Sequence, residues 1–177
     1  MHHSLANRHR EGFSLLELLI VVAIILVVAA IAIPNLLRAR MAANESSAAN
    51  SMHTINAAEV TYESTYPASG FSSSLATLGP AAAGACTAPT AANACLIDYS
   101  LSSATSPAAS KNGYYFGYAV GANSVSYTVG SAASKFNQTG VRSFCSIEDG
   151  VIRQDVPNSQ ATPTTVSSTC TGWPAIQ

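Results

Sequence analysis

A run of apolar side chains near the N-terminus constrains this chain more than any other feature. Residues 18–33 include no polar side chain, and only Ser14 and Glu17 interrupt the apolar residues just before them. As a helix rising 1.5 Å per residue, residues 13–33 would measure about 30 Å, the thickness of a bilayer's hydrocarbon core. A helix that is apolar on every side does not suit the core of a small soluble domain. The run therefore predicts a membrane-spanning helix.

A secretory signal peptide is the alternative interpretation of the same run. Such a peptide needs a small-residue cleavage site after its apolar region, and the alanines within residues 29–32 supply one. The placement of the polar residues favours the spanning helix. A short basic segment ends at Gly12, Phe13 follows, and a lone acid, Glu17, lies inside the apolar stretch.

Glu17 is costly at membrane depth, by about 2.5–3.5 kcal/mol on insertion scales, and such residues usually have a partner. One interpretation is an interfacial carboxylate that reaches the headgroups. The other is a pair with a cation of similar depth, although the run itself has no Lys or Arg. Cleavage between Gly12 and Phe13 would create an α-amine on Phe13, one helical turn before Glu17, for pairing within a chain or between neighbours.

These residues resemble the N-terminal signature of type IV pilins. The resemblance covers residues 12 to about 66. It rests on a short basic leader, on GFSLLE at 12–17, on the apolar run that follows, and on AIPN at 32–35.

The resemblance implies a structural subunit that polymerises with copies of itself. A prepilin peptidase would cleave after Gly12 and methylate the amine of Phe13, Glu17 would guide assembly, and Pro34 would kink the helix. An assembly ATPase and a platform protein are the implied machinery. One departure stands out: many pilins have a glycine where this chain has Leu26. In the family that glycine helps the helix to unwind between it and the proline during assembly, so Pro34 would have to act in unwinding without it.

Membrane orientation also rests on the resemblance. Arg8 and Arg10 precede the span while Arg38 and Arg40 follow it, so the positive-inside rule gives a tie. The resemblance places the leader inside and the head outside. We expect a single-pass inner-membrane protein before assembly and an extracellular pilus at the cell surface afterwards.

The expected fold is α+β: a long N-terminal helix, its first half membrane-spanning, packed on a small antiparallel β-sheet head in a pilin-like ladle shape. The expected segments are a leader at 1–12, a long helix at 13–65 (13–33 spanning, 34–65 amphipathic), an αβ-loop at 66–110, an antiparallel sheet at 111–156 and a C-terminal disulfide-held segment at 157–177.

The second half of the helix predicts its own buried face. At 3.6-residue spacing the apolar stripe consists of Ala48, Met52, Ile55 and Tyr62, and we expect it to pack on the sheet. Glu59 falls within the stripe and is expected to be a satisfied carboxylate at the edge of the packing surface. His53 has no metal-ligating neighbour at suitable spacing and is expected to be a surface residue.

Alternating residues predict four strands, at 113–120, 124–129, 141–147 and 151–154, with turns at 121–123 and 148–150. The expected core faces consist of Tyr114, Phe116 and Tyr118 in the first strand, and of Val125, Tyr127 and Val129 in the second. Residues 75–78 are expected to form one helical turn within an ordered loop. The tail from Pro157 is expected to be coil.

Four cysteines in a chain that crosses a membrane indicate two disulfides in an oxidising compartment, with three possible connectivities. Cys86–Cys95 together with Cys145–Cys170 closes the shortest loops and matches the pilin habit of stapling the C-terminal segment. A zinc site is the alternative, but the cysteines lack CxxC spacing and there is no paired His.

Charge and motifs argue against several other functions. The chain has eight Lys and Arg against nine Asp and Glu, with no basic patch for nucleic acid. It has no nucleophile–base–acid set and no phosphate-binding or dinucleotide-binding motif. We therefore expect no enzyme activity, no cofactor and no metal.

Three hypotheses follow: a structural subunit of a type IV pilus, a pseudopilin of a type II secretion system, and a membrane-anchored extracytoplasmic enzyme. The pseudopilin alternative would want an acidic calcium loop near the C-terminus, for which Asp149 and Asp155 are sparse candidates. The enzyme lacks catalytic residues.

Overall fold

The computed structural model describes residues 13–176. The chain divides into two compact units, Met1–Arg38 and Ala39–Gln177, and each is described by itself. The expected leader at 1–12, with Gly12, lies outside the described residues.

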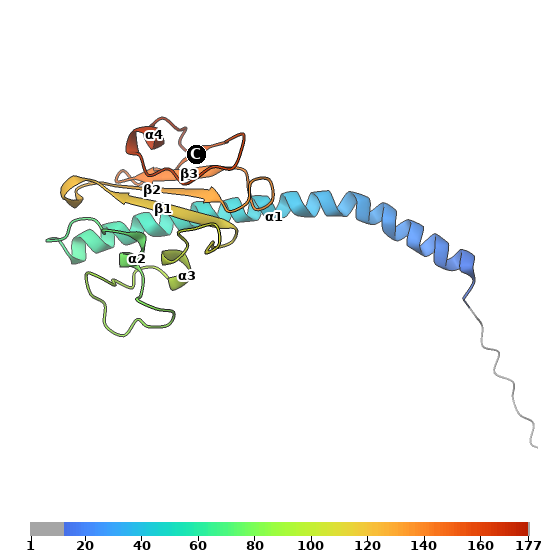
Figure 1. Ribbon diagram of the computed structural model, residues 1–177, viewed down its shortest axis with the longest axis horizontal. Helices are drawn as coiled ribbons and strands as arrows, with labels where there is room; N and C mark the ends of the chain where they lie inside the picture. Colours follow the sequence, from blue (N-terminus) through green and yellow to red (C-terminus); the bar gives the residue numbers. More distant parts are fainter. Residues whose placement is uncertain (1–12, 177) are drawn as a thin grey trace, which may run out of the picture. The chain divides into compact units, whose positions relative to one another are not determined.

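One helix, α1 (Leu15–Thr65), begins in the first unit and continues through the second (Figure 1). Its sequence is rich in Ala and Leu and has no glycine, which favours a helix. Pro34 lies inside it without ending it, although Pro34 has no amide proton to donate to Ala30. Residues 26–33 are therefore helical up to the proline. The kink at Pro34 stays a prediction.

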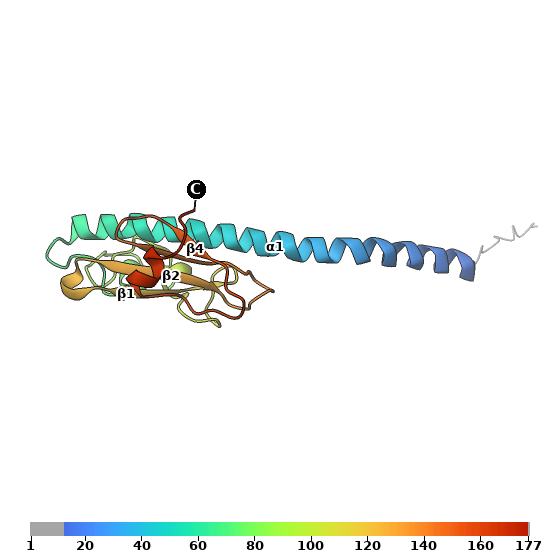
Figure 2. The same ribbon diagram turned by 90° about the horizontal axis from the view of Figure 1, so that it is seen from above.

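The second unit contains a four-stranded antiparallel sheet in the order β1-β2-β3-β4. Its strands are β1 (Tyr114–Val120), β2 (Tyr127–Ala133), β3 (Ser143–Ile147) and β4 (Arg153–Asp155). Its short helices are α2 (Leu75–Leu78), α3 (Tyr99–Ser102), η1 (Ala122–Ser124) and α4 (Ser167–Thr171). The sheet lies along the second half of α1 (Figure 2), so the predicted α+β fold is confirmed.

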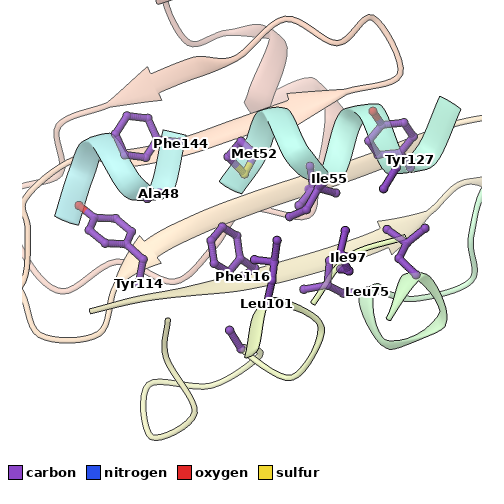
Figure 3. Packing of buried hydrophobic residues seen from close by; sticks show 14 of the residues in the cluster. Ala48, Met52, Ile55, Leu75, Ile97, Leu101, Tyr114, Phe116, Tyr127 and Phe144 are labelled. Atoms are coloured by element: carbon purple, nitrogen blue, oxygen red, sulfur yellow. The ribbon is translucent and has the colours of Figure 1, made fainter. Parts of the chain in front are cut away.

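The core lies between α1 and the sheet (Figure 3). All four residues of the predicted α1 stripe are buried, at 3% exposure or less: Ala48, Met52, Ile55 and Tyr62. From the sheet they meet Tyr114, Phe116, Tyr127, Val129 and Phe144, and from the loop Leu75, Leu78 and Leu101. This packing confirms the stripe and most of the predicted strand faces.

Val125 corrects one strand prediction. It is 72% exposed and follows η1 instead of lying in a strand. Asn123 and Ser124 take left-handed backbone conformations, with φ of 57° and 55°, which an extended strand cannot contain. The turn therefore runs longer than predicted, and β2 begins at Tyr127.

Side chains that capture backbone amides delay the next two strands. The Glu45 carboxylate accepts hydrogen bonds from the amides of Val141 and Arg142, at 2.9 and 3.2 Å, and β3 begins only at Ser143. The Asp149 carboxylate accepts from the Val151 amide at 2.9 Å, and β4 begins at Arg153 instead of residue 151.

The tail is less irregular than predicted, because α4 forms within it and carries Cys170. Cys170 is bonded to Cys145, and Cys86 to Cys95. Cys145 and Cys170 are both 0% exposed and pack with Ile147 and Trp173. Cys86, in contrast, is exposed.

The different environments of the two disulfides predict different costs of removal. Replacing Cys145 and Cys170 together by Ala should destabilise the head by about 2–4 kcal/mol, because a longer loop is released and a buried contact is lost. The matched pair Cys86→Ala with Cys95→Ala should cost less. Urea unfolding of the detergent-solubilised protein measures both. Equal losses would contradict the unequal roles of the two disulfides.

Candidate functional site

The first candidate site is the apolar surface of α1 before Pro34. Every large apolar side chain from Phe13 to Ile33 is exposed, from 83% at Phe13 down to 47% at Val22. This helix is long and apolar enough to cross a membrane, with mean hydropathy 3.2 in its most apolar window and none of that window buried. Burying one such side chain fully is worth about 1.5–3 kcal/mol. The segment therefore requires lipid or other helices around it.

Glu17 lies in the first turn of α1 and is exposed. The positive end of the helix dipole favours a carboxylate at this position. Phe13 and Ser14 precede the helix, and the Leu18 amide donates to the Ser14 carbonyl at 3.2 Å. Among the described residues, the three ion pairs do not involve Glu17. Its carboxylate is thus accessible to a cation, and pairing with Phe13 stays a prediction.

Glu59 is a buried polar site that the sequence placed wrongly. It was expected at the edge of the packing surface, but it is 0% exposed. The Ser72 amide donates to it at 3.0 Å and the Ser72 hydroxyl at 2.5 Å. The Tyr118 hydroxyl donates to the Ser72 carbonyl at 3.0 Å. The carboxylate is therefore satisfied, as expected, and it fastens the start of the αβ-loop to α1 and β1.

Burial raises the pKa of the Glu59 carboxyl above its ordinary value, since the charged form loses its hydration. The hydrogen bonds from Ser72 stabilise the charged form and oppose that rise. The neighbouring Tyr118 hydroxyl also has a raised pKa, chiefly through burial and then through the Glu59 charge.

Asn56 is a second polar fastening of α1, and the sequence analysis missed it. Its amide donates to the Ser146 hydroxyl at 2.9 Å and to the Gly150 carbonyl at 3.1 Å, and it accepts from the Tyr127 hydroxyl at 3.0 Å. A polar residue next to Ile55 on the buried face was the available signal. Glu45, through Val141 and Arg142, is the third fastening.

The metal-ligating side chains are scattered in the described part of the chain. Between residues 13 and 176, no group of three His, Cys, Asp or Glu side chains is arranged to hold a metal ion. Asp149 is instead engaged by Arg153 at 2.6 Å. His53 is exposed on α1, as predicted.

An exposed apolar N-terminal helix that continues into the core of a small, disulfide-stapled antiparallel sheet is the α+β architecture of pilin-like proteins. Comparison with known proteins supports this class at the N-terminus. Residues 7–33 match the family model for the prokaryotic N-terminal methylation motif.

The chain is also similar to a particular pilus protein. It is 59% identical to the type IV wide pilus major component PilA4 of Thermus thermophilus over 39 residues. That alignment covers 22% of this chain and 30% of the relative. None of the solved structures matches the chain.

These similarities confirm the resemblance to type IV pilins stated from the sequence. The relative is a major component of a pilus, which is a structural subunit and not an enzyme. Both similarities lie in the N-terminal segment. The description of the head therefore rests on the structure of the head itself.

The buried Glu59 predicts a pH-dependent stability of the head. Its pKa is raised in the folded protein, so its contribution to stability is fully present below the unfolded pKa of 4.5 and is lost as pH rises through the folded pKa. Glu59→Gln removes the charge and keeps the size of the side chain; its amide oxygen accepts from the Ser72 amide and its NH2 group donates to the Ser72 hydroxyl oxygen. It should be more stable than wild type near pH 8 and similar near pH 4.

Two further variants check this account by thermal unfolding across that pH range. Glu59→Ala should cost about 1–3 kcal/mol, because it leaves the Ser72 amide unpaired. Glu63→Gln, which neutralises an exposed carboxylate of the same helix, should leave the pH profile unchanged. A Glu59→Gln profile parallel to wild type at every pH would contradict the assignment.

Proposed function

We propose that this chain is a structural subunit of a type IV pilus. The observation that carries the proposal is the uncovered apolar helix of residues 13–33, within a matched methylation motif, attached to a head that has its own core. A helix exposed all round in its own chain requires like helices once it leaves lipid.

Storage and assembly follow from that helix. While inserted, residues 13–33 hold the subunit in the inner membrane. Extraction into a filament moves them from lipid into a bundle of like helices, so their apolar surface stays out of water. The head remains outside and becomes the surface of an extracellular pilus.

Processing precedes assembly. A prepilin peptidase cleaves between Gly12 and Phe13 and methylates the new amine of Phe13, and an assembly ATPase with a platform protein extracts the subunit. The motif match at residues 7–33, which includes this junction, supports the step.

Glu17 supplies direction to an otherwise featureless apolar surface. An unpaired carboxylate in the core of a filament is costly, whereas a carboxylate paired with the Phe13 amine of a neighbour fixes their relative position. Its exposure in the first turn of α1 supports this role.

The helix is proposed to stay intact through most of the apolar run. Leu26 has a better helix propensity than glycine by about 1 kcal/mol, and α1 is unbroken from Leu15 through Pro34. Any unwinding in a filament is then confined to the few residues before Pro34.

A pseudopilin is the second candidate, since it would share the same N-terminal segment. The pilus subunit is favoured because the matched relative is a pilus major component. In addition, Asp149 is engaged by Arg153, and Asp155 pairs along the ladder with Ser143, so these two acids do not converge on one loop.

Shearing surface filaments from cells and identifying their protein by mass spectrometry tests the proposal. A pilus subunit dominates the sheared fraction. A pseudopilin is absent from it, and an anchored enzyme stays with the membrane. Absence of the chain from sheared filaments of piliated cells would contradict the proposal.

Processing gives a specific prediction. The mature protein should begin at Phe13 with a methylated amine, measurable by mass spectrometry of the N-terminal peptide. Gly12→Val should block cleavage, because the peptidase accepts only a very small residue there. A mature N-terminus within residues 29–33 would show a secretory signal peptide instead.

The Glu17 prediction separates assembly from folding. Glu17→Gln should insert, be cleaved after Gly12 and form both disulfides, yet yield few or no sheared filaments, since the Phe13 amine lacks its partner. Asp98→Asn, which removes one charge from the head and keeps a side-chain oxygen to cap α3, serves as the matched control and should assemble normally. A wild-type yield of filaments from Glu17→Gln would contradict the pairing with Phe13 and would favour the interpretation of Glu17 as an interfacial carboxylate.

A further inference from the structure

The charges of the head are distributed unevenly along α1. We call the region around the Asn44 turn of α1 the basic end; its cations are Arg40, Lys135 and Arg142. We call the region around the last turns of α1 the acidic end; its unpaired acids are Glu63 and Glu148.

Hydrogen bonds place the cations of the basic end beside α1. The loop between β2 and β3 is held there because the Asn44 amide donates to the Thr139 carbonyl at 2.8 Å. The Thr139 hydroxyl in turn accepts a hydrogen bond from the Lys135 amide at 3.1 Å. Exposed Lys135 therefore lies in the same loop, four residues before the residue that contacts Asn44. Figure 1 shows this loop, in orange, next to α1. Exposed Arg40 lies four residues before Asn44 on α1.

The basic end keeps a positive excess after its acids are counted. Glu45 lies 3.6 Å from the Arg142 guanidinium and is already engaged by backbone amides. Asp155, opposite Ser143 in the ladder, lies at the same end. Arg40 and Lys135 take part in none of the three ion pairs among the described residues.

The acidic end is placed by Asn56, whose amide donates to the Gly150 carbonyl and so holds the β3–β4 hairpin against α1. Exposed Glu148 lies in that hairpin. Its neighbour Asp149 is neutralised by Arg153 at 2.6 Å. Exposed Glu63 lies in the last turn of α1. The excess at this end is therefore negative.

Helix geometry gives the separation of the two ends. Asn56 lies 16 residues and Glu63 lies 23 residues beyond Arg40 in one continuous helix. At 1.5 Å per residue these spans are about 24 and 35 Å. Lys135 is placed beside Asn44, which lies 12 and 19 residues before the same two positions, or about 18 and 29 Å. The cations of one end therefore do not reach the acids of the other within one head.

We propose that the basic end of one head docks on the acidic end of a second copy of this chain. The excess charge of the basic end is positive and that of the acidic end is negative. Each end is therefore complementary to the other, and this identifies a second copy of the chain as the partner. A contact between two different surfaces of like subunits is heterologous, and it builds an open helical array when its rotation does not close a ring. Two basic or two acidic ends repel each other, so the contact also fixes polarity.

The inference rests on the proposed pilus function and deepens it. The apolar side chains hold subunits together without specifying how far one slides along the next, and the proposed Glu17–Phe13 pair fixes the position of neighbours only at the N-terminal end of the helix. The paired ends specify an axial offset between contacting heads of about 18–35 Å.

Carbodiimide crosslinking of native filaments tests the contact without any mutation, because the reagent joins only amines and carboxylates already in contact. Peptides linking Lys135 to Glu63 or to Glu148 should appear in filaments and disappear in detergent-dispersed subunits. Crosslinks from Lys135 that are absent, or confined to carboxylates of its own end, overturn the proposal.

Charge reversal tests the same contact by assembly. Arg40→Glu with Lys135→Glu should lower the yield of sheared filaments at least about tenfold, as should Glu63→Lys with Glu148→Lys. All four changes together restore complementarity and should return the yield to near wild type. The matched control combines the first pair with Asn50→Lys, Thr54→Lys, Ala57→Lys and Thr61→Lys, which restore the net charge on an exposed face of α1 and should not rescue assembly.

The outcomes separate the two proposals. Wild-type yield from either reversal, or equal yields from the four-change variant and the control, overturns the end-to-end contact while the pilus function stands. A wild-type chain that forms no filament overturns both. Leader cleavage and both disulfides, checked in each variant, show that reduced yield reflects docking.

Discussion

The structure depends on one constraint: a single helix must serve two different surroundings. Before Pro34 its apolar side chains are exposed on all sides and contribute nothing to the core of the head. After residue 39 the helix has one buried stripe, whose Met52 and Ile55 are completely covered by the sheet and the αβ-loop. The head therefore folds around the second half alone, which leaves the first half uncovered, as the proposed exchange of lipid for neighbouring helices requires.

Three polar side chains of α1 connect the second half of the helix to loops of the head by hydrogen bonds. Glu45 holds the residues before β3, Asn56 holds the β3–β4 hairpin, and Glu59 holds Ser72 at the start of the αβ-loop. Each replaces hydration with hydrogen bonds inside the packing surface, where an unpaired group would cost about 1–3 kcal/mol. The second half of α1 is thereby hydrogen-bonded to three separate loops of the head.

Periodic features of the sequence predicted the fold well. The 3.6-residue stripe identified the buried face of α1, and alternation in residues 114–118 identified the core face of β1, because both depend on local geometry.

The errors have non-local causes. Val125 left the sheet when Asn123 and Ser124 turned left-handed, and β3 started late because Glu45, nearly a hundred residues earlier, captured its amides. The burial of Glu59 depended on Ser72 in a loop without periodicity, so no local pattern indicated it. At the N-terminus, Phe13 and Glu17 belong to a linear motif that matches at residues 7–33, so sequence alone suggests their roles, which stay predictions.

The central claim is that residues 13–33 exchange lipid for identical helices. Helical reconstruction of filaments sheared from producing cells tests it most directly. The account predicts that this chain is the repeating subunit, with residues 13–33 of neighbouring copies packed together at the filament axis and the heads outside. Filaments built from another chain, or a reconstruction in which residues 13–33 lie away from the axis, would contradict it.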